Sequence, residues 1–218
     1  MTNHIISDFG HYAELVTSDL FDLHIFRGVS DGKLHHLLPP IGRSPRWSGL
    51  STKKLTAVER AMLKRFKQEG APFVSQPMTD WDWLALARHH GLPGRLLDWS
   101  RNPLVALFFA VQGGNNTEGA VYADSFSRTI QTTKATDPFK VTEVSKLLSV
   151  HSHARISAQA SVLTVHPDPR KAYSSRTMVS LRISGKLKVT LKQALRRLGI
   201  HPATIYQDLE GVAQSIYG

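Results

Sequence analysis

One segment of the chain, Leu104 to Gln112, is apolar on every side of the helix that it is expected to form. Asn102 and Pro103 predict the start of that helix, because an asparagine side chain caps free backbone N–H groups and proline fits the first helical position. A helix that is apolar all round is stable only when protein surrounds it. The rest of the chain must therefore fold around this segment.

Hydrophobic patterns elsewhere predict both helices and strands. A capping box from Thr56 to Glu59 predicts a helix that ends at Gly70, and Thr79 with two aspartates behind it predicts a second helix to about His90. Further helices are expected over residues 11–19, 191–198 and 202–216, strands over 21–26, 120–123, 161–166 and 177–183, loops over 29–53 and 126–140, and a short amphipathic piece over 141–150. Together these elements in 218 residues predict a single α+β domain over residues 1–218.

The composition is that of a folded protein from a reducing compartment. Hydrophobic residues make up 41% of the chain and charged residues 20%, a balance that can bury a core. The chain has no cysteine, which excludes disulfides, thiolate metal sites and a cysteine nucleophile. The first residues lack the pattern of a signal peptide, and no stretch reaches the roughly 20 apolar residues of a membrane span. We therefore expect a cytoplasmic protein with no membrane partner.

The formal net charge of +10 makes polyanions candidate partners, because binding of Lys and Arg to phosphates releases counterions. On the predicted helix over residues 56–70, Arg60, Lys64 and Lys67 form a basic face, which we take as a candidate nucleic-acid contact. A basic surface that only keeps the protein in solution is the alternative. The charge alone does not decide between them.

The segment from His89 to Ser100, just before the apolar helix, concentrates side chains that can take part in chemistry. It holds two imidazoles, a guanidinium, a carboxylate, an indole and a hydroxyl, which belong to His89, His90, Arg95, Asp98, Trp99 and Ser100. Functional side chains gather on loops that rigid elements hold, and the N-terminus of the next helix offers N–H groups to an anion. We favour a functional segment whose shape an Arg95–Asp98 pair maintains. The alternative is that this pair and a core Trp99 are purely structural.

A second candidate is Phe26-Arg27-Gly28, at the end of a predicted strand in which Phe21, Leu23 and Ile25 share one face. The planar guanidinium of arginine matches phosphate, and glycine permits close approach of a ligand. A structural salt bridge is the alternative role for Arg27.

The histidines are candidate metal ligands, at positions 35, 36, 89, 90, 151, 153 and 166. However, neighbouring histidines on a strand point to opposite faces, and the chain has no His-Glu-x-x-His motif. We therefore predict no metal site. A metal-dependent nuclease built on these histidines is kept as a third functional alternative. The chain also lacks a Walker loop, a dinucleotide-fold glycine loop and a serine hydrolase elbow.

These segments resemble the FRG domain family, which is named for a triplet like Phe26-Arg27-Gly28. The resemblance continues over nearly the whole chain, through Pro39, Pro40 and Arg43, a helix over Glu59–Phe66, the segment His89 to Ser100, the helix after Asn102, Arg155 with Gln159, and residues 199–211. Departures are Gly94 and Ser100, where the family has threonine, and Ala160, where glycine is common. FRG domains occur in bacteria and phages, often near defence or toxin genes, and this implies a role of that kind.

A looser similarity to ADP-ribosyltransferases of the arginine–serine–glutamate type implies a split β-sheet core with surrounding helices, and NAD as substrate. By this resemblance Arg27 and Gly28 bind the dinucleotide phosphates, His89 with His90 positions the nicotinamide ribose, and Ser100 holds the nicotinamide side. Gln159 stands where these enzymes carry a glutamate, so it would orient the ribose without supplying charge. Glu210 is the fallback acid.

The resemblances imply an NAD-dependent ADP-ribosyltransferase-like toxin or defence effector. Its target would be a nucleic acid or a nucleic-acid-associated protein, and an antitoxin or immunity partner would accompany it. The alternative is a non-catalytic nucleic-acid- or protein-binding module of such a system. The glutamine at position 159 favours that alternative.

Overall fold

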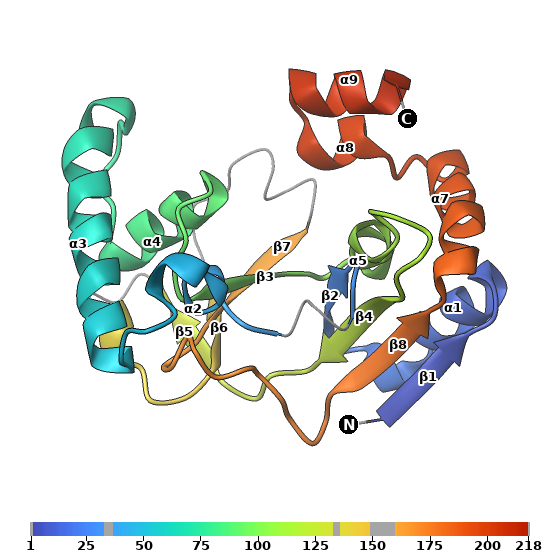
Figure 1. Cartoon of the computed structure of the whole chain (residues 1–218), viewed down its shortest axis with the longest axis horizontal. Coiled ribbons are helices and arrows are strands. Elements are labelled where there is room, and N and C mark those ends of the chain that lie inside the picture. Colours follow the sequence, from blue (N-terminus) through green and yellow to red (C-terminus); the bar gives the residue numbers. More distant parts are fainter. Residues whose placement is uncertain (1, 33–36, 133–135, 149–159, 218) are drawn as a thin grey trace.

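The computed structural model describes residues 2–32, 37–132, 136–148 and 160–217, and in these ranges the strands form one eight-stranded mixed sheet (Figure 1). The strand order is β1-β8-β4-β2-β3-β7-β6-β5, with parallel pairing of β1 to β8 and of β5 to β6 and antiparallel pairing between the other neighbours. The strands are β1 (Thr2–Ile6), β2 (Ile25–Val29), β3 (Leu96–Ser100), β4 (Gly119–Asp124), β5 (Thr129–Gln131), β6 (Ser145–Leu148), β7 (Ser161–Val165) and β8 (Val179–Ile183). The predicted α+β class is confirmed.

Helices pack around both ends of the sheet. They are α1 (Phe9–Val16), α2 (Pro40–Arg43), α3 (Thr52–Gly70), α4 (Asp80–His89), α5 (Pro103–Ala110), α7 (Lys188–Arg197), α8 (Pro202–Tyr206) and α9 (Leu209–Tyr217). Figure 1 shows α3 and α4 beside the end of the sheet that holds β5 and β6, and α1 and α7 beside the end that holds β1 and β8. None of the helices in the described ranges is long and apolar enough to cross a membrane.

The apolar helix α5 lies directly on the middle of the sheet, as its sequence predicts. Its side chains are largely buried, and the Asn102 side chain caps it by accepting a hydrogen bond from the Leu104 N–H. The helix approaches β2 so closely that a Cβ atom at Gly28 would lie 1.8 Å from the Ala106 carbonyl oxygen. Glycine is therefore required at position 28 for helix packing. The sequence had predicted that this glycine allows a ligand to approach.

Several predicted elements differ in their bounds. Residues 19–21 form a short 3-10 helix and β2 begins only at Ile25, so Arg27 lies inside the strand and Leu23 is 78% exposed instead of sharing a buried face with Phe21. The predicted helix over 202–216 is two helices, because Gln207 adopts a left-handed conformation with φ of 51°. The expected loop over 29–53 contains α2, and the amphipathic piece over 141–150 contains β6.

The capping box predicted from Thr56 to Glu59 is wrong, whereas the helix start at Thr79 is confirmed. Helix α3 begins earlier, where the Ser51 side chain accepts a hydrogen bond from the Lys54 N–H, so Thr56 and Glu59 lie inside the helix. Glu59 is 2% exposed and faces the protein interior.

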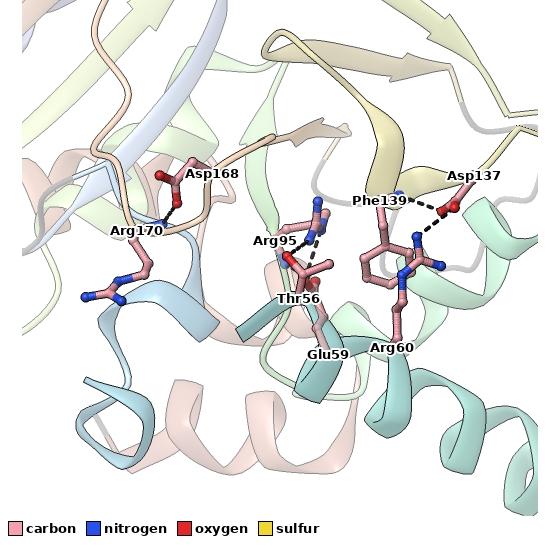
Figure 2. A network of polar contacts seen from close by, with 8 residues as sticks. All are labelled: Thr56, Glu59, Arg60, Arg95, Asp137, Phe139, Asp168 and Arg170. Atoms are coloured by element: carbon pink, nitrogen blue, oxygen red, sulfur yellow. Dashed lines mark hydrogen bonds and ion pairs between the residues drawn. The ribbon is translucent and has the colours of Figure 1, made fainter. Parts of the chain in front are cut away.

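A buried ion pair between Glu59 and Arg95 joins α3 to the start of β3 (Figure 2). The Glu59 carboxylate accepts hydrogen bonds from the Arg95 backbone N–H at 2.6 Å and from its Nε at 2.9 Å, and Arg95 Nη2 donates to the Thr56 hydroxyl at 3.2 Å. The Arg95 guanidinium also lies 4.6 Å from the centre of the Phe139 ring. The predicted Arg95–Asp98 pair is therefore wrong, because Arg95 forms its ion pair with the Glu59 carboxylate of α3.

We predict that Glu59→Gln lowers the free energy of unfolding by about 3–5 kcal/mol, since it leaves the Arg95 guanidinium buried without its counter-charge. Urea unfolding followed by tryptophan fluorescence measures this loss. The matched control is Glu69→Gln, which breaks the exposed Arg65–Glu69 pair and should change stability by less than about 1 kcal/mol. Equal losses for the two variants would refute the special role of Glu59.

Candidate anion-binding site

A pocket opens where β2 and β3 separate. These two strands are joined by the register pair Phe26–Ser100, and beyond it their backbones part. The pocket has a volume of about 630 Å³ and is lined by β2, β3, the end of α4, one side of α5 and Tyr206 of α8. It therefore lies in the middle of the sheet, between the two halves of the strand order.

The pocket brings together most of the residues that the sequence predicts as ligand contacts. Arg27, Gly28, His89, His90 and Ser100 all line it. These residues come from three separate elements and their flanking turns, so only the folded chain places them side by side. Gln159, the fourth predicted catalytic residue, lies outside the described residues.

Arg27 spans the gap between the two strands. Its Nη1 atom donates a hydrogen bond to the Asp98 carbonyl oxygen at 2.5 Å, so a side chain connects β2 to β3 where the backbones have parted. The same Nη1 atom lies 3.9 Å from the Asp98 carboxylate. Arg88, at the end of α4, binds that carboxylate more directly, with Nη2 2.5 Å from Oδ2. Asp98 is therefore shared by two arginines. Arg27 makes the structural contacts that one alternative expects, and it also lines the pocket, as the ligand-binding alternative expects.

The pocket wall carries more positive charge than its carboxylate balances. Burial, with the charges of Arg43 and Arg88, lowers the pKa of Arg27 to about 10, although the Asp98 carboxylate opposes this shift. Even so, Arg27 is protonated at neutral pH. Among the described residues, the Nε atoms of Arg27 and Arg88 are buried and have no hydrogen-bond partner. Two unsatisfied donors beside an excess of positive charge favour an anionic ligand.

Ser100 lies at the base of the pocket and is tied to the start of α5. Its hydroxyl accepts a hydrogen bond from the Asn102 N–H at 2.9 Å, and the residue is 5% exposed. The hydroxyl thus helps fix the turn between β3 and α5. A ligand that contacts Ser100 would lie at the N-terminal end of α5, where the helix dipole favours negative charge.

A buried chain of polar groups lies behind β3. The Trp99 Nε1 donates to the Thr164 hydroxyl at 3.0 Å, and that hydroxyl lies 3.0 Å from Nε2 of His166. Burial, together with the charges of Arg27 and Arg95, lowers the pKa of His166 to about 3. His166 is therefore a neutral core histidine, and its Nε2 is already in contact with the Thr164 hydroxyl.

The other candidate groups lie elsewhere. Of the predicted nucleic-acid contacts on α3, Arg60 pairs with Asp137 at 2.6 Å and Lys67 pairs with Asp80, while Lys64 is exposed. Two of these three charges are thus partly neutralised. Across the described part of the chain no group of three or more His, Asp or Glu side chains is arranged to hold a metal ion. The histidines at 35, 36, 151 and 153 fall outside that part.

Arg88 is a charged pocket residue that was not predicted as a ligand contact from the sequence. It sits in the last turn of α4, immediately before His89. A basic residue in a last turn is ordinarily explained by the helix dipole, so its position carried no separate signal. Its proximity to Asp98 depends on how α4 packs against β3, which no local pattern encodes.

Comparison with known families supports the resemblance seen in the sequence. A family model described as the FRG domain matches residues 22–119. Residues 22–119 are therefore similar to the FRG domain. This stretch holds every lining residue of the pocket except Tyr206, so the pocket lies largely within the matched region. No curated protein and no solved structure matches the chain.

The buried histidine behind β3 predicts a pH dependence of stability. His166 has a pKa of about 3 in the folded state, below its ordinary value of about 6.5, so the unfolded chain binds more protons between these values. Stability should therefore fall as the pH decreases below about 6.5. His166→Gln should remove about 1.4 kcal/mol of the loss between pH 7.5 and pH 5.5, as measured by urea unfolding at each pH. An unchanged pH dependence in the variant would show that His166 keeps its ordinary pKa in the folded state and would contradict this prediction.

Proposed function

We propose that the pocket binds NAD and that the protein is an ADP-ribosyltransferase-like effector of a toxin or defence system. The observation that carries this proposal is Arg27, which lies in a dinucleotide-sized pocket with excess positive charge and a buried, unsatisfied Nε. The proposal also draws on the match of residues 22–119 to the FRG domain and on the looser sequence resemblance to ADP-ribosyltransferases.

In this proposal each lining residue contacts one part of NAD. Arg27 binds the phosphates beside Gly28, His89 and His90 position the nicotinamide ribose, and Ser100 contacts the nicotinamide side. The bond between the ribose C1′ and the nicotinamide nitrogen breaks and nicotinamide leaves with the bonding electron pair. A nucleophile of the target forms a new bond to C1′ and loses its proton to solvent. Gln159 would orient the ribose during this exchange.

The proposed target is a polyanion or a protein bound to one. The net charge of +10 favours such a target, because released counterions stabilise binding. Because Arg60 and Lys67 form ion pairs with Asp137 and Asp80, α3 should bind a nucleic acid less strongly than its sequence suggests. Of the three predicted contacts on α3, Lys64 is exposed. An antitoxin or immunity partner is part of the same proposal, as is action in the cytoplasm, where NAD is plentiful.

A non-catalytic binding module is the second candidate function. Asp98 is the one carboxylate among the described residues that line the pocket, and it is already paired with Arg88 and close to Arg27. A paired carboxylate gives little extra stabilisation to a developing ribosyl cation. This observation favours binding of NAD, or of a related anion, without turnover.

The test is to incubate the purified protein with labelled NAD, alone and with RNA, DNA or cell lysate, and to follow nicotinamide release and label transfer. We expect release by the wild type and a loss of about 10- to 100-fold in Arg27→Ala, since a charge-assisted contact to phosphate contributes about 1.5–3 kcal/mol. Arg46→Ala, which removes an exposed arginine outside the pocket, is the matched control and should keep full activity.

The fold of each variant is checked by its circular dichroism and melting temperature, because Arg27 also bridges β2 and β3. If no acceptor yields nicotinamide release while NAD still binds through Arg27, the binding module is the better account. If NAD neither binds nor reacts, both candidates fail for this ligand.

A further inference from the structure

The pocket has an aromatic corner as well as charged groups. Phe109, near the end of α5, and Tyr206, at the end of α8, both line the pocket and form this corner. Their ring centres lie 6.4 Å apart, and the ring planes are inclined by 69°. Both residues are half-buried, whereas the neighbouring Phe108 is 4% exposed and belongs to the core. The two rings therefore keep surface that a ligand in the pocket can contact.

Packing on several sides holds Tyr206 in place. Ile205, next to it on α8, is 1% exposed and lies in the core. A Cβ atom at Gly211 of α9 would lie 2.9 Å from the Tyr206 Cβ, so α9 is packed tightly against this residue. The Phe108 ring meets the Tyr206 ring edge to face, with centres 6.1 Å apart. A ring that is already held in position loses little conformational freedom when a ligand binds.

Arg27 lies between the two ends of the pocket. Phe26, just before it on β2, pairs with Ser100, and Gly28, just after it, packs against the backbone of α5. Phe109 is the next-to-last residue of α5, which places it about 9 Å along the helix axis from the first residue. A phosphate bound to Arg27 would therefore have Ser100 on one side and the aromatic corner on the other.

The combination of aromatic surface and positive charge identifies a class of ligand. Aromatic side chains bind nucleobases by stacking, because every base has a π face. A corner of two inclined rings lets a planar group stack on one ring and meet the edge of the other. Arg27 and Arg88, with their excess positive charge in the same pocket, favour a phosphate. A nucleotide carries both groups, whereas a sugar phosphate carries only one.

We propose that Phe109 and Tyr206 form a nucleobase subsite, so that the pocket recognises a nucleotide by its base as well as by its phosphate. In NAD this base is the adenine, and the nicotinamide lies at the Ser100 end. The inference rests on the proposed function in that NAD is such a nucleotide, and it adds the place of the adenine. Tyr206 lies outside residues 22–119, so the C-terminal part of the chain completes this subsite.

Calorimetric titration with AMP and ribose 5-phosphate tests the subsite, because these two ligands differ only in the base. We expect AMP to bind at least about tenfold more tightly. Tyr206→Leu should weaken AMP binding about tenfold and change ribose 5-phosphate binding by less than about threefold. Tyr206→Phe keeps the ring and should retain the affinity for AMP. The matched control is Tyr217→Leu, which replaces a tyrosine that is 98% exposed and should leave both affinities unchanged.

Phe109→Leu provides an independent check, because Tyr206 also packs against α9 and its replacement could disturb the fold. We expect the same selective loss of AMP binding in this variant. Phe73→Leu, which replaces a phenylalanine that is 88% exposed, is its control and should bind AMP like the wild type. The melting temperature of each variant shows whether it is folded.

The outcomes separate this inference from the proposed reaction. A preference for AMP that depends on Tyr206, together with no nicotinamide release from NAD, would keep the subsite and refute the transferase. AMP that binds no more tightly than ribose 5-phosphate would overturn the subsite even if NAD were turned over. Titration with nicotinamide mononucleotide tests the orientation, because a loss of this ligand instead of AMP in Tyr206→Leu would place nicotinamide in the corner and overturn the proposal.

Discussion

Between β2 and β3 the sheet is joined at Phe26 and Ser100, and the fold around this narrow join creates the pocket. Helix α5 packs closely against β2 at Gly28, where a side chain would meet the Ala106 backbone. The guanidinium of Arg27 then makes the connection that the backbones do not, through the Asp98 carbonyl oxygen. A charged side chain thus holds the two halves of the sheet together and at the same time forms the wall of the pocket.

The start of β3 is held by the buried pair of Glu59 and Arg95. This pair attaches α3 to the residue just before β3, and His166 and Thr164 support the same strand from β7. A buried ion pair contributes little net stability compared with apolar packing, but breaking it is expensive. Its effect here is to fix where β3 begins, and therefore where Asp98 and Ser100 lie. The geometry of the site depends on interactions outside it.

Asp98 links these structural features to the proposed chemistry. It balances part of the charge of Arg27 and Arg88, and this allows the two guanidinium groups to remain close together without a ligand. The same pairing makes Asp98 a poor catalytic acid or base. Recognition of an anion by the described residues is therefore better supported than any bond-breaking step.

The sequence by itself determined the local elements. Patterns within a few residues predict the capped starts of two helices, at Thr79 and Asn102, and the apolar character of α5. Similar patterns predict the strands β4, β7 and β8, and the structure confirms all of these elements. The sequence also pointed to the two segments that meet at the pocket as the candidate site, because reactive side chains are concentrated there. Errors arose where a residue had both a local and a distant partner, as at Glu59, which fits a capping box but binds Arg95.

Only the tertiary structure decided which charges meet. Arg95 pairs with Glu59 across 36 positions of sequence, and Asp98 pairs with Arg88 from α4 and lies beside Arg27 from β2. Electrostatic partners are chosen by distance in space, and spacing along the chain carries no information about a contact between elements that pack side by side. The sequence therefore identified the groups of the candidate site, while the packing of α4 and α5 around the β2–β3 join set their arrangement.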